Sequence, residues 1–192
     1  MQIEPHVTQN AEQIFAKIAK AFPVCAASDE FYFFPQVVAK DLDWHHWDDF
    51  SDKAVFAFAD TLRQAETTLA DLSNTEAFAP QRTDSELLHG ALRTLREQLI
   101  EIAPQHSQPT FHLTVIAAGL SEALATGQPA AWAGRIAGLP AFLQRATDSL
   151  IEIPRLFLLP GLSMARDQRR WLQQLQANGL EVGSALPAFD RF

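Results

Sequence analysis

Apolar side chains recur at intervals of three and four residues along most of this chain. Stripes with this spacing, which is the period of an α-helix, run over Ile14–Phe22, Val55–Leu69 and Leu88–Ile102. Alternation typical of a β-strand hardly occurs. The one aromatic run, Phe31–Phe34, is cut off by Pro35 and has no partner segment. The pattern therefore predicts an all-α fold.

Capping residues and prolines place the ends of the first helices. Thr8 or Asn10 is expected to begin a helix that ends before Pro23, and Ser51 is expected to cap the next one. The third stripe continues up to Pro104. We expect the second and third helices to pack as an antiparallel hairpin.

The second half of the chain is more strongly punctuated. A helix rich in small residues is expected over residues 111–125, and residues 130–153 are expected to form one helix that is interrupted or kinked at Pro140. Pro154 and Pro160 are expected to bracket an apolar connector before a last long helix. The complete prediction is a multi-helix bundle of about seven helices.

Length and composition favour one folded unit. The chain has 192 residues, of which 47% are apolar, and this is enough for a substantial core. We predict a single all-α domain over residues 1–192, which is possibly the N-terminal segment of a longer protein.

The charge is unevenly distributed. Residues 1–80 carry thirteen acidic and five basic side chains, whereas residues 81–192 carry ten of each. An acidic front half argues against nucleic acid or an anionic membrane as a partner, because both favour basic surfaces. A protein partner, or a missing C-terminal portion of the same chain, remains compatible with it. The sequence does not indicate an oligomeric state.

Cysteine usage and the N-terminal pattern bear on location. Cys25 is the single cysteine and lies among apolar residues, so no internal disulfide can form and a small buried side chain is expected. The chain has no basic and apolar leader pattern and no apolar run of membrane-spanning length. A cytoplasmic location is the expectation.

The densest chemistry lies between residues 31 and 50, where seven of the nineteen aromatic residues fall. Such a block suits either a core or the mouth of a binding site, because tryptophan and tyrosine dominate interaction hot spots. The candidate binding residues are Tyr32, Trp44, His45, His46, Trp47 and Asp49. In the alternative interpretation, the rings fill the core between the first helix and the helix capped by Ser51.

No complete catalytic constellation occurs. The chain lacks His-Glu-x-x-His, a nucleophile elbow and a phosphate-binding glycine loop, and it implies no cofactor. A metal-dependent hydrolase would need His45, His46 and Asp48 or Asp49 to meet a distant ligand such as Glu122 or His112. The alternative is a histidine packed among aromatic rings and hydrogen-bonded to a nearby aspartate.

Several segments together resemble one bacterial family. They are Phe31-Tyr32-Phe33-Phe34-Pro35, Asp48-Asp49-Phe50-Ser51, Pro109, Gly119-Leu120, Trp132, Arg135, Leu139-Pro140-Ala141-Phe142-Leu143, Ala146, Leu150 and Pro154. Over residues 30–175 this pattern is similar to the N-terminal part of the DUF885 family. Members of that family are longer, mostly helical and resemble zinc metallopeptidases, with His-Glu-x-x-His in their C-terminal part. This chain has no such motif, so the resemblance assigns it no catalytic or metal-binding residue.

The resemblance implies a non-catalytic helical domain that acts as a scaffold or as a partner- or substrate-binding wall. If so, an exposed apolar face is expected where the partner packs. The two alternatives are the metal-dependent hydrolase around His45, His46 and Asp49, and a small-molecule binder that uses Trp44 and Trp47.

Overall fold

The computed structural model describes residues 6–73 and 82–192, and within these ranges every regular element is helical. The prediction of an all-α fold is therefore confirmed. In chain order the elements are α1 (His6–Ala21), α2 (Pro23–Ala27), α3 (Asp52–Ser73), α4 (Arg82–Glu97), the π-helical turn η2 (Gln98–Ile102), α5 (Pro104–Ser107), α6 (Pro109–Ala125), α7 (Pro129–Ser149), α8 (Arg155–Ala177) and α9 (Ala185–Phe189).

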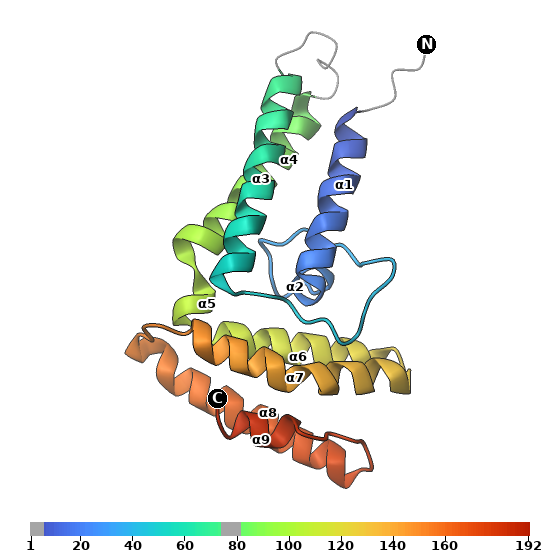
Figure 1. The fold of residues 1–192 in the computed structure, drawn as a ribbon, viewed down its shortest axis with the longest axis vertical. Coiled ribbons are helices and arrows are strands. Elements are labelled where there is room, and N and C mark those ends of the chain that lie inside the picture. Colours follow the sequence, from blue (N-terminus) through green and yellow to red (C-terminus); the bar gives the residue numbers. More distant parts are fainter. Residues whose placement is uncertain (1–5, 74–81) are drawn as a thin grey trace.

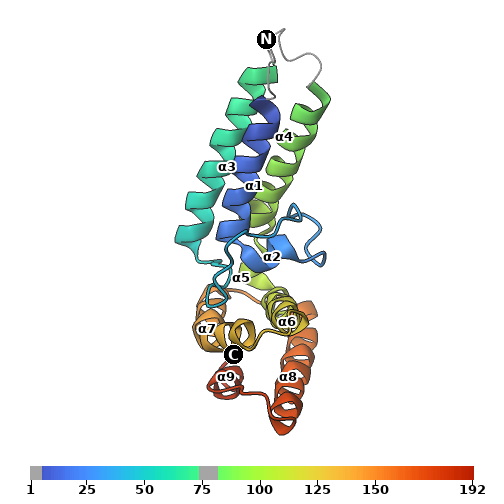
Figure 2. The ribbon, with the colours of Figure 1, turned by 90° about the vertical axis from the view of Figure 1, so that its right-hand side faces the viewer.

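The helices form two groups that cross each other. Helices α1, α3 and α4 stand together, and α6 and α7 lie side by side across their lower ends (Figure 1). Helices α8 and α9 cover the opposite face of the α6/α7 pair, as the turned view in Figure 2 shows. The α6/α7 pair is consequently the central layer of the molecule.

Helices α3 and α4 form the predicted antiparallel hairpin. Their facing leucines are buried, and the Ser85 hydroxyl donates a hydrogen bond to the Leu69 carbonyl at 3.4 Å. Arg96 on α4 pairs with Glu66 on α3 at 2.8 Å. Ser51 caps α3 as expected, since its hydroxyl accepts a hydrogen bond from the Ala54 amide.

The α4 helix ends in a sharp bend. It continues through η2 to Ala103, whose φ of 46° is left-handed, and its amide donates to the Gln98 carbonyl at 2.9 Å. The bend at 103 turns the chain into α5. The hairpin thereby meets the central layer at an angle.

Two prolines in the second half of the chain, Pro140 and Pro160, lie inside helices. Helix α7 runs from Pro129 to Ser149 with Pro140 inside it. The connector predicted over residues 155–159 is wrong, because α8 already begins at Arg155 and continues through Pro160. Pro160 lies in the second turn of α8 and has no amide hydrogen to donate to the carbonyl of Leu156. Only this one backbone hydrogen bond is missing, and Leu156 is exposed.

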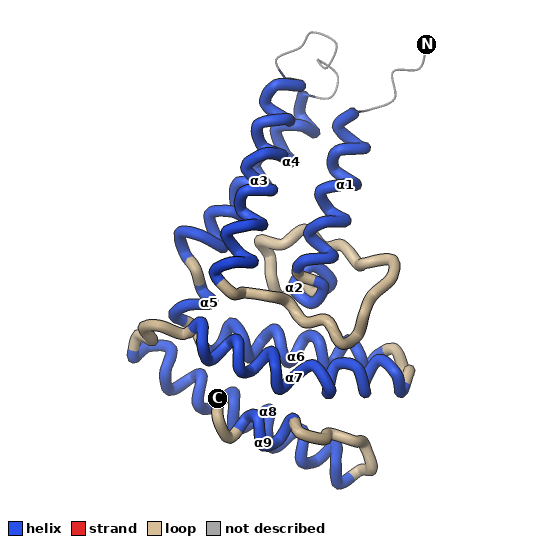
Figure 3. The backbone as a smooth tube through the Cα atoms, in the orientation of Figure 1, coloured by secondary structure: helices blue, strands red, loops and turns tan. Residues whose placement is uncertain are grey.

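The longest connection lies between α2 and α3 and is drawn as a tan loop in Figure 3. It contains the aromatic block of residues 31–50. This loop packs against the central layer and carries most of the candidate site residues.

Candidate functional site

Trp47 anchors the long loop in the groove between α6 and α7. Its side chain is 2% exposed, and its indole Nε1 donates a hydrogen bond to the Arg135 carbonyl at 3.1 Å. The groove is open because glycines line it: a Cβ on Gly119 or Gly138 would lie 2.8 Å from the indole ring. One turn before Gly138, Gly134 makes the same room for the backbone of Trp44. Trp47 is therefore a core residue.

Arg135 is the polar counterpart of Trp47. Its side chain is fully buried, and its Cζ lies 5.1 Å from the centroid of the Trp47 ring and 5.2 Å from that of Trp44. One guanidinium nitrogen donates to the His46 carbonyl and another contacts the Glu122 carboxylate at 3.3 Å. Burial lowers the pKa of Arg135 and raises that of Glu122, and each charge partly offsets the shift of the other.

Asp48 ties the same loop to α2. Its two carboxylate oxygens accept hydrogen bonds from the amides of Val24 and Cys25 at 2.8 and 2.9 Å, at the start of a helix whose N-cap, Phe22, supplies no side-chain cap. Burial raises the pKa of Asp48. The hydrogen bonds from the Cys25 thiol and from these two amides lower it, as does the charge of Arg135, but they offset the effect of burial only in part. Asp48 thus serves as a remote helix cap.

Cys25 is buried, as predicted, and free. Burial, and secondarily the charge of Asp48, raises the pKa of its thiol well above the ordinary value. The thiolate that nucleophilic chemistry needs is therefore disfavoured at this position.

The side chains of the remaining predicted site residues lie outside this buried junction. Tyr32 is 82% exposed and makes an edge-to-face contact with Phe33. His45 and His46 are both exposed, so neither is a core residue. Asp49 is half-buried and faces Arg145 at 3.8 Å. The buried rings Phe31, Phe34, Trp47 and Phe50 agree with the interpretation of the block as core.

His45, His46 and Asp49 are not joined by the distant ligands that a metal site would need. Glu122 is bonded to Arg135, and His112 is buried against the carbonyl of Gln105. Across residues 6–73 and 82–192, no three or more histidine, cysteine or acidic side chains are grouped so that they could hold a metal ion.

A serine and a histidine do meet at the junction of α6 and α7. Ser149 Oγ lies 3.3 Å from Nε2 of His112, but this nitrogen lies closer, at 2.9 Å, to the carbonyl of Gln105. A carbonyl only accepts, so Nε2 carries the proton and has no lone pair for the serine hydroxyl. Burial lowers the pKa of His112 to about 4, which keeps the ring neutral. The pair is thus not arranged as a nucleophile and its base.

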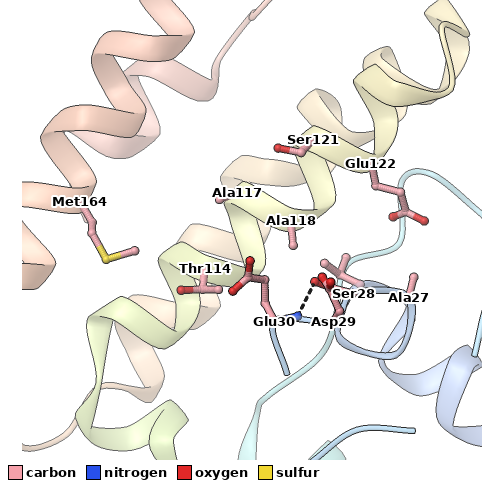
Figure 4. A pocket seen from close by; sticks show the side chains of 11 residues that line it. Ala27, Ser28, Asp29, Glu30, Thr114, Ala117, Ala118, Ser121, Glu122 and Met164 are labelled. Atoms are coloured by element: carbon pink, nitrogen blue, oxygen red, sulfur yellow. Dashed lines mark hydrogen bonds between the residues drawn. The ribbon is translucent and has the colours of Figure 1, made fainter. Parts of the chain in front are cut away.

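A hollow of about 510 Å³ opens where the turn after α2 faces α6 and α8. Figure 4 shows Asp29 and Glu30 from the turn, Glu122 from α6 and Met164 from α8 around it. The amide of Glu30 donates to the Ser28 hydroxyl at 3.2 Å. The Glu122 carboxylate, shared with Arg135, connects this hollow to the buried junction.

The most unusual surface lies at the start of α8. Leu156 and Leu159 are 75% and 74% exposed, and their neighbours on the same segment are also exposed. We call this surface the α8 ridge and define it by Ile151, Ile153, Leu156, Leu158, Leu159 and Leu162. Scattered exposed leucines are ordinary, but six exposed aliphatic side chains within twelve residues are typical of an interaction surface. The sequence shows the apolar run over residues 155–159, but its flanking prolines predicted a connector and not the start of a helix.

In comparisons with family models, curated proteins and solved structures, nothing matches this chain significantly. The resemblance to the DUF885 family stays a prediction. No helix in the described part of the chain is long and apolar enough to cross a membrane.

Proposed function

We propose that this chain is a non-catalytic helical domain, similar to the N-terminal part of DUF885 proteins, that acts as a protein-binding scaffold. The α8 ridge is its docking surface, and the occupant is an amphipathic helix of a partner protein. The observation that carries this proposal is the exposure of six aliphatic side chains within twelve residues.

The shape of the ridge supports a helical occupant. Leu156, Leu159 and Leu162 are spaced by three residues on one helix, so they form a row into which the side chains of a second helix can pack. Burying such a row removes apolar area from water, which contributes about 25 cal/mol for each Å².

The charges around the ridge indicate the polarity of the partner. Arg155 and Arg166 are exposed beside it, and in the described part of the chain neither is within ion-pair distance of a carboxylate. They would face acidic residues at the rim of the bound helix, because complementary rim charges favour association.

The internal chemistry supports a scaffold over an enzyme. Burial shifts the pKa values of Cys25, Asp48, Arg135 and His112, and these groups are bonded to one another or to the backbone. Their perturbed pKa values reflect buried structural contacts that hold the long loop and the central layer together.

A pair of synthetic helical peptides tests the proposal. Both carry a leucine stripe, which is flanked by glutamates in one and by lysines in the other, and binding to the protein is followed by fluorescence anisotropy. We expect the glutamate peptide to bind more tightly. The double variant Leu156→Asp/Leu159→Asp should weaken its binding by about tenfold or more, and Arg155→Gln/Arg166→Gln should reduce the preference for glutamate.

The matched control is Phe56→Asp/Leu87→Asp, which places the same charges at exposed apolar positions on α3 and α4. Equal binding to the ridge variant and to this control would contradict the proposal. Sedimentation velocity supplies a second check: a dimer that dissociates in the ridge variant would identify a second copy of the chain as the occupant, and would overturn the assignment of a separate partner.

A further inference from the structure

The pocket between α1 and α3 has the features of a small-molecule site. It has a volume of about 460 Å³ and is lined by residues of both helices and of the long loop. This volume lies in the range of ligand-binding clefts in proteins. The candidate residues His46 and Asp49 lie at its loop side.

The apolar part of the pocket is built from phenyl rings and small side chains. Phe22 and Phe58 meet edge to face with ring centroids 5.0 Å apart, and Phe22 also stacks on Phe50 at 5.4 Å. On α3, Ala54 and Ala57 are too small to fill the space beside these rings. Phe22 is only 1% exposed, so it supports Phe58 from beneath. The half-buried Phe58 ring, held in this way, is the apolar surface that a flat ring can contact.

The polar part of the pocket is cationic on the α1 side. Lys17 and Lys20 are exposed and three residues apart on α1, so they share a face of the helix. Among the described residues, neither ammonium group lies within ion-pair distance of a carboxylate. Asp49, the acidic residue of the lining, faces Arg145 at 3.8 Å and accepts a hydrogen bond from the Ser51 amide.

From this arrangement we infer that the α1–α3 pocket binds an aromatic carboxylate. The ring lies against Phe58, and the carboxylate accepts hydrogen bonds from Lys17 and Lys20. The unpaired cations select an anion although the whole chain carries a net charge of −8. This site is independent of the α8 ridge, because α1 and α3 lie on one side of the α6/α7 layer and α8 lies on the other (Figure 1).

The probes are 2-naphthoate and its neutral analogue 2-naphthamide, titrated into the full chain by calorimetry. We expect naphthoate to bind about tenfold more tightly than the amide, and we expect added salt to reduce this difference. Lys17→Gln/Lys20→Gln should remove the preference for the anion. Ala57→Trp fills the hollow from an exposed position and should abolish binding of both probes.

Lys53→Gln is the matched control, because it removes a lysine of α3 that does not line the pocket. It should bind naphthoate as the wild type does, and so should the ridge variant Leu156→Asp/Leu159→Asp, whatever that variant does to peptide binding. Circular dichroism verifies that each variant is folded. The inference is overturned if naphthoate does not bind, if the amide binds equally well, or if the control loses as much affinity as the double lysine variant.

Discussion

Trp47 and Arg135 hold each other through two different contacts. The indole of Trp47 donates to the backbone carbonyl of Arg135, and the guanidinium of Arg135 lies 5.1 Å from the centroid of the same indole. The residues are 88 positions apart in the sequence. This pair fixes the long loop on the central layer, and the first two predictions concern the contacts that support it.

The first prediction concerns the close approach of the loop to α7. A Cβ at position 138 would lie 2.5 Å from the His45 carbonyl oxygen and 2.8 Å from the Trp47 ring, so Gly138→Ala must displace the loop. We expect the free energy of unfolding, measured by urea denaturation, to fall by about 2 kcal/mol.

Gly90 provides the matched control for this change. It lies inside α4, and a Cβ there would meet nothing within 4 Å. Gly90→Ala should therefore stabilise the protein by up to about 1 kcal/mol, because alanine has the higher helix propensity. Equal effects of the two substitutions would show that the loop does not pack on Gly138.

The second prediction concerns the remote cap on α2. Asp48→Ala leaves the amides of Val24 and Cys25 without acceptors inside the protein. We expect a loss of about 3 kcal/mol in the free energy of unfolding, since each unsatisfied buried donor costs about 1–3 kcal/mol. Asp48→Asn should lose less, because its remaining oxygen still satisfies one amide. If asparagine proves as costly as alanine, the cap is not the role of this side chain.

The third prediction concerns pH. The pKa of His112 is about 4 in the folded protein, against an ordinary value of 6.5, because burial opposes the charged ring. The unfolded state therefore binds the proton more tightly than the folded state. As a result, the contribution of His112 to the free energy of unfolding is complete above pH 6.5 and is lost as the pH falls towards 4. The loss amounts to about 3 kcal/mol.

Urea denaturation of the wild type and of His112→Gln across this pH range measures the effect. Glutamine can still donate to the Gln105 carbonyl but does not titrate, so the difference in stability between the two proteins should narrow as the pH falls. His45→Gln removes an exposed imidazole and should keep the pH dependence of the wild type. A constant difference between the wild type and His112→Gln would contradict the assignment.

Part of the candidate site could be anticipated from the sequence. The aromatic density of residues 31–50 suggested either a core or a binding site, and Phe31, Phe34 and Phe50 lie in the core. The contact between Arg135 and Trp47 was not predicted, because no local pattern links two residues that are 88 positions apart. The pocket of Lys17 and Lys20 was also missed, since more than half of its lining comes from α3 and the long loop, which are distant in the sequence.

The sequence by itself determined the helices, because helical hydrogen bonds and apolar stripes are local and repeat every three to four residues. Only the tertiary structure decided what Gly119, Gly138 and Asp48 do, since a close approach or a remote cap depends on which segments meet. The same holds for the α8 ridge. An apolar run near a proline can be a buried connector or an exposed helix, and its surroundings in the folded molecule determine which.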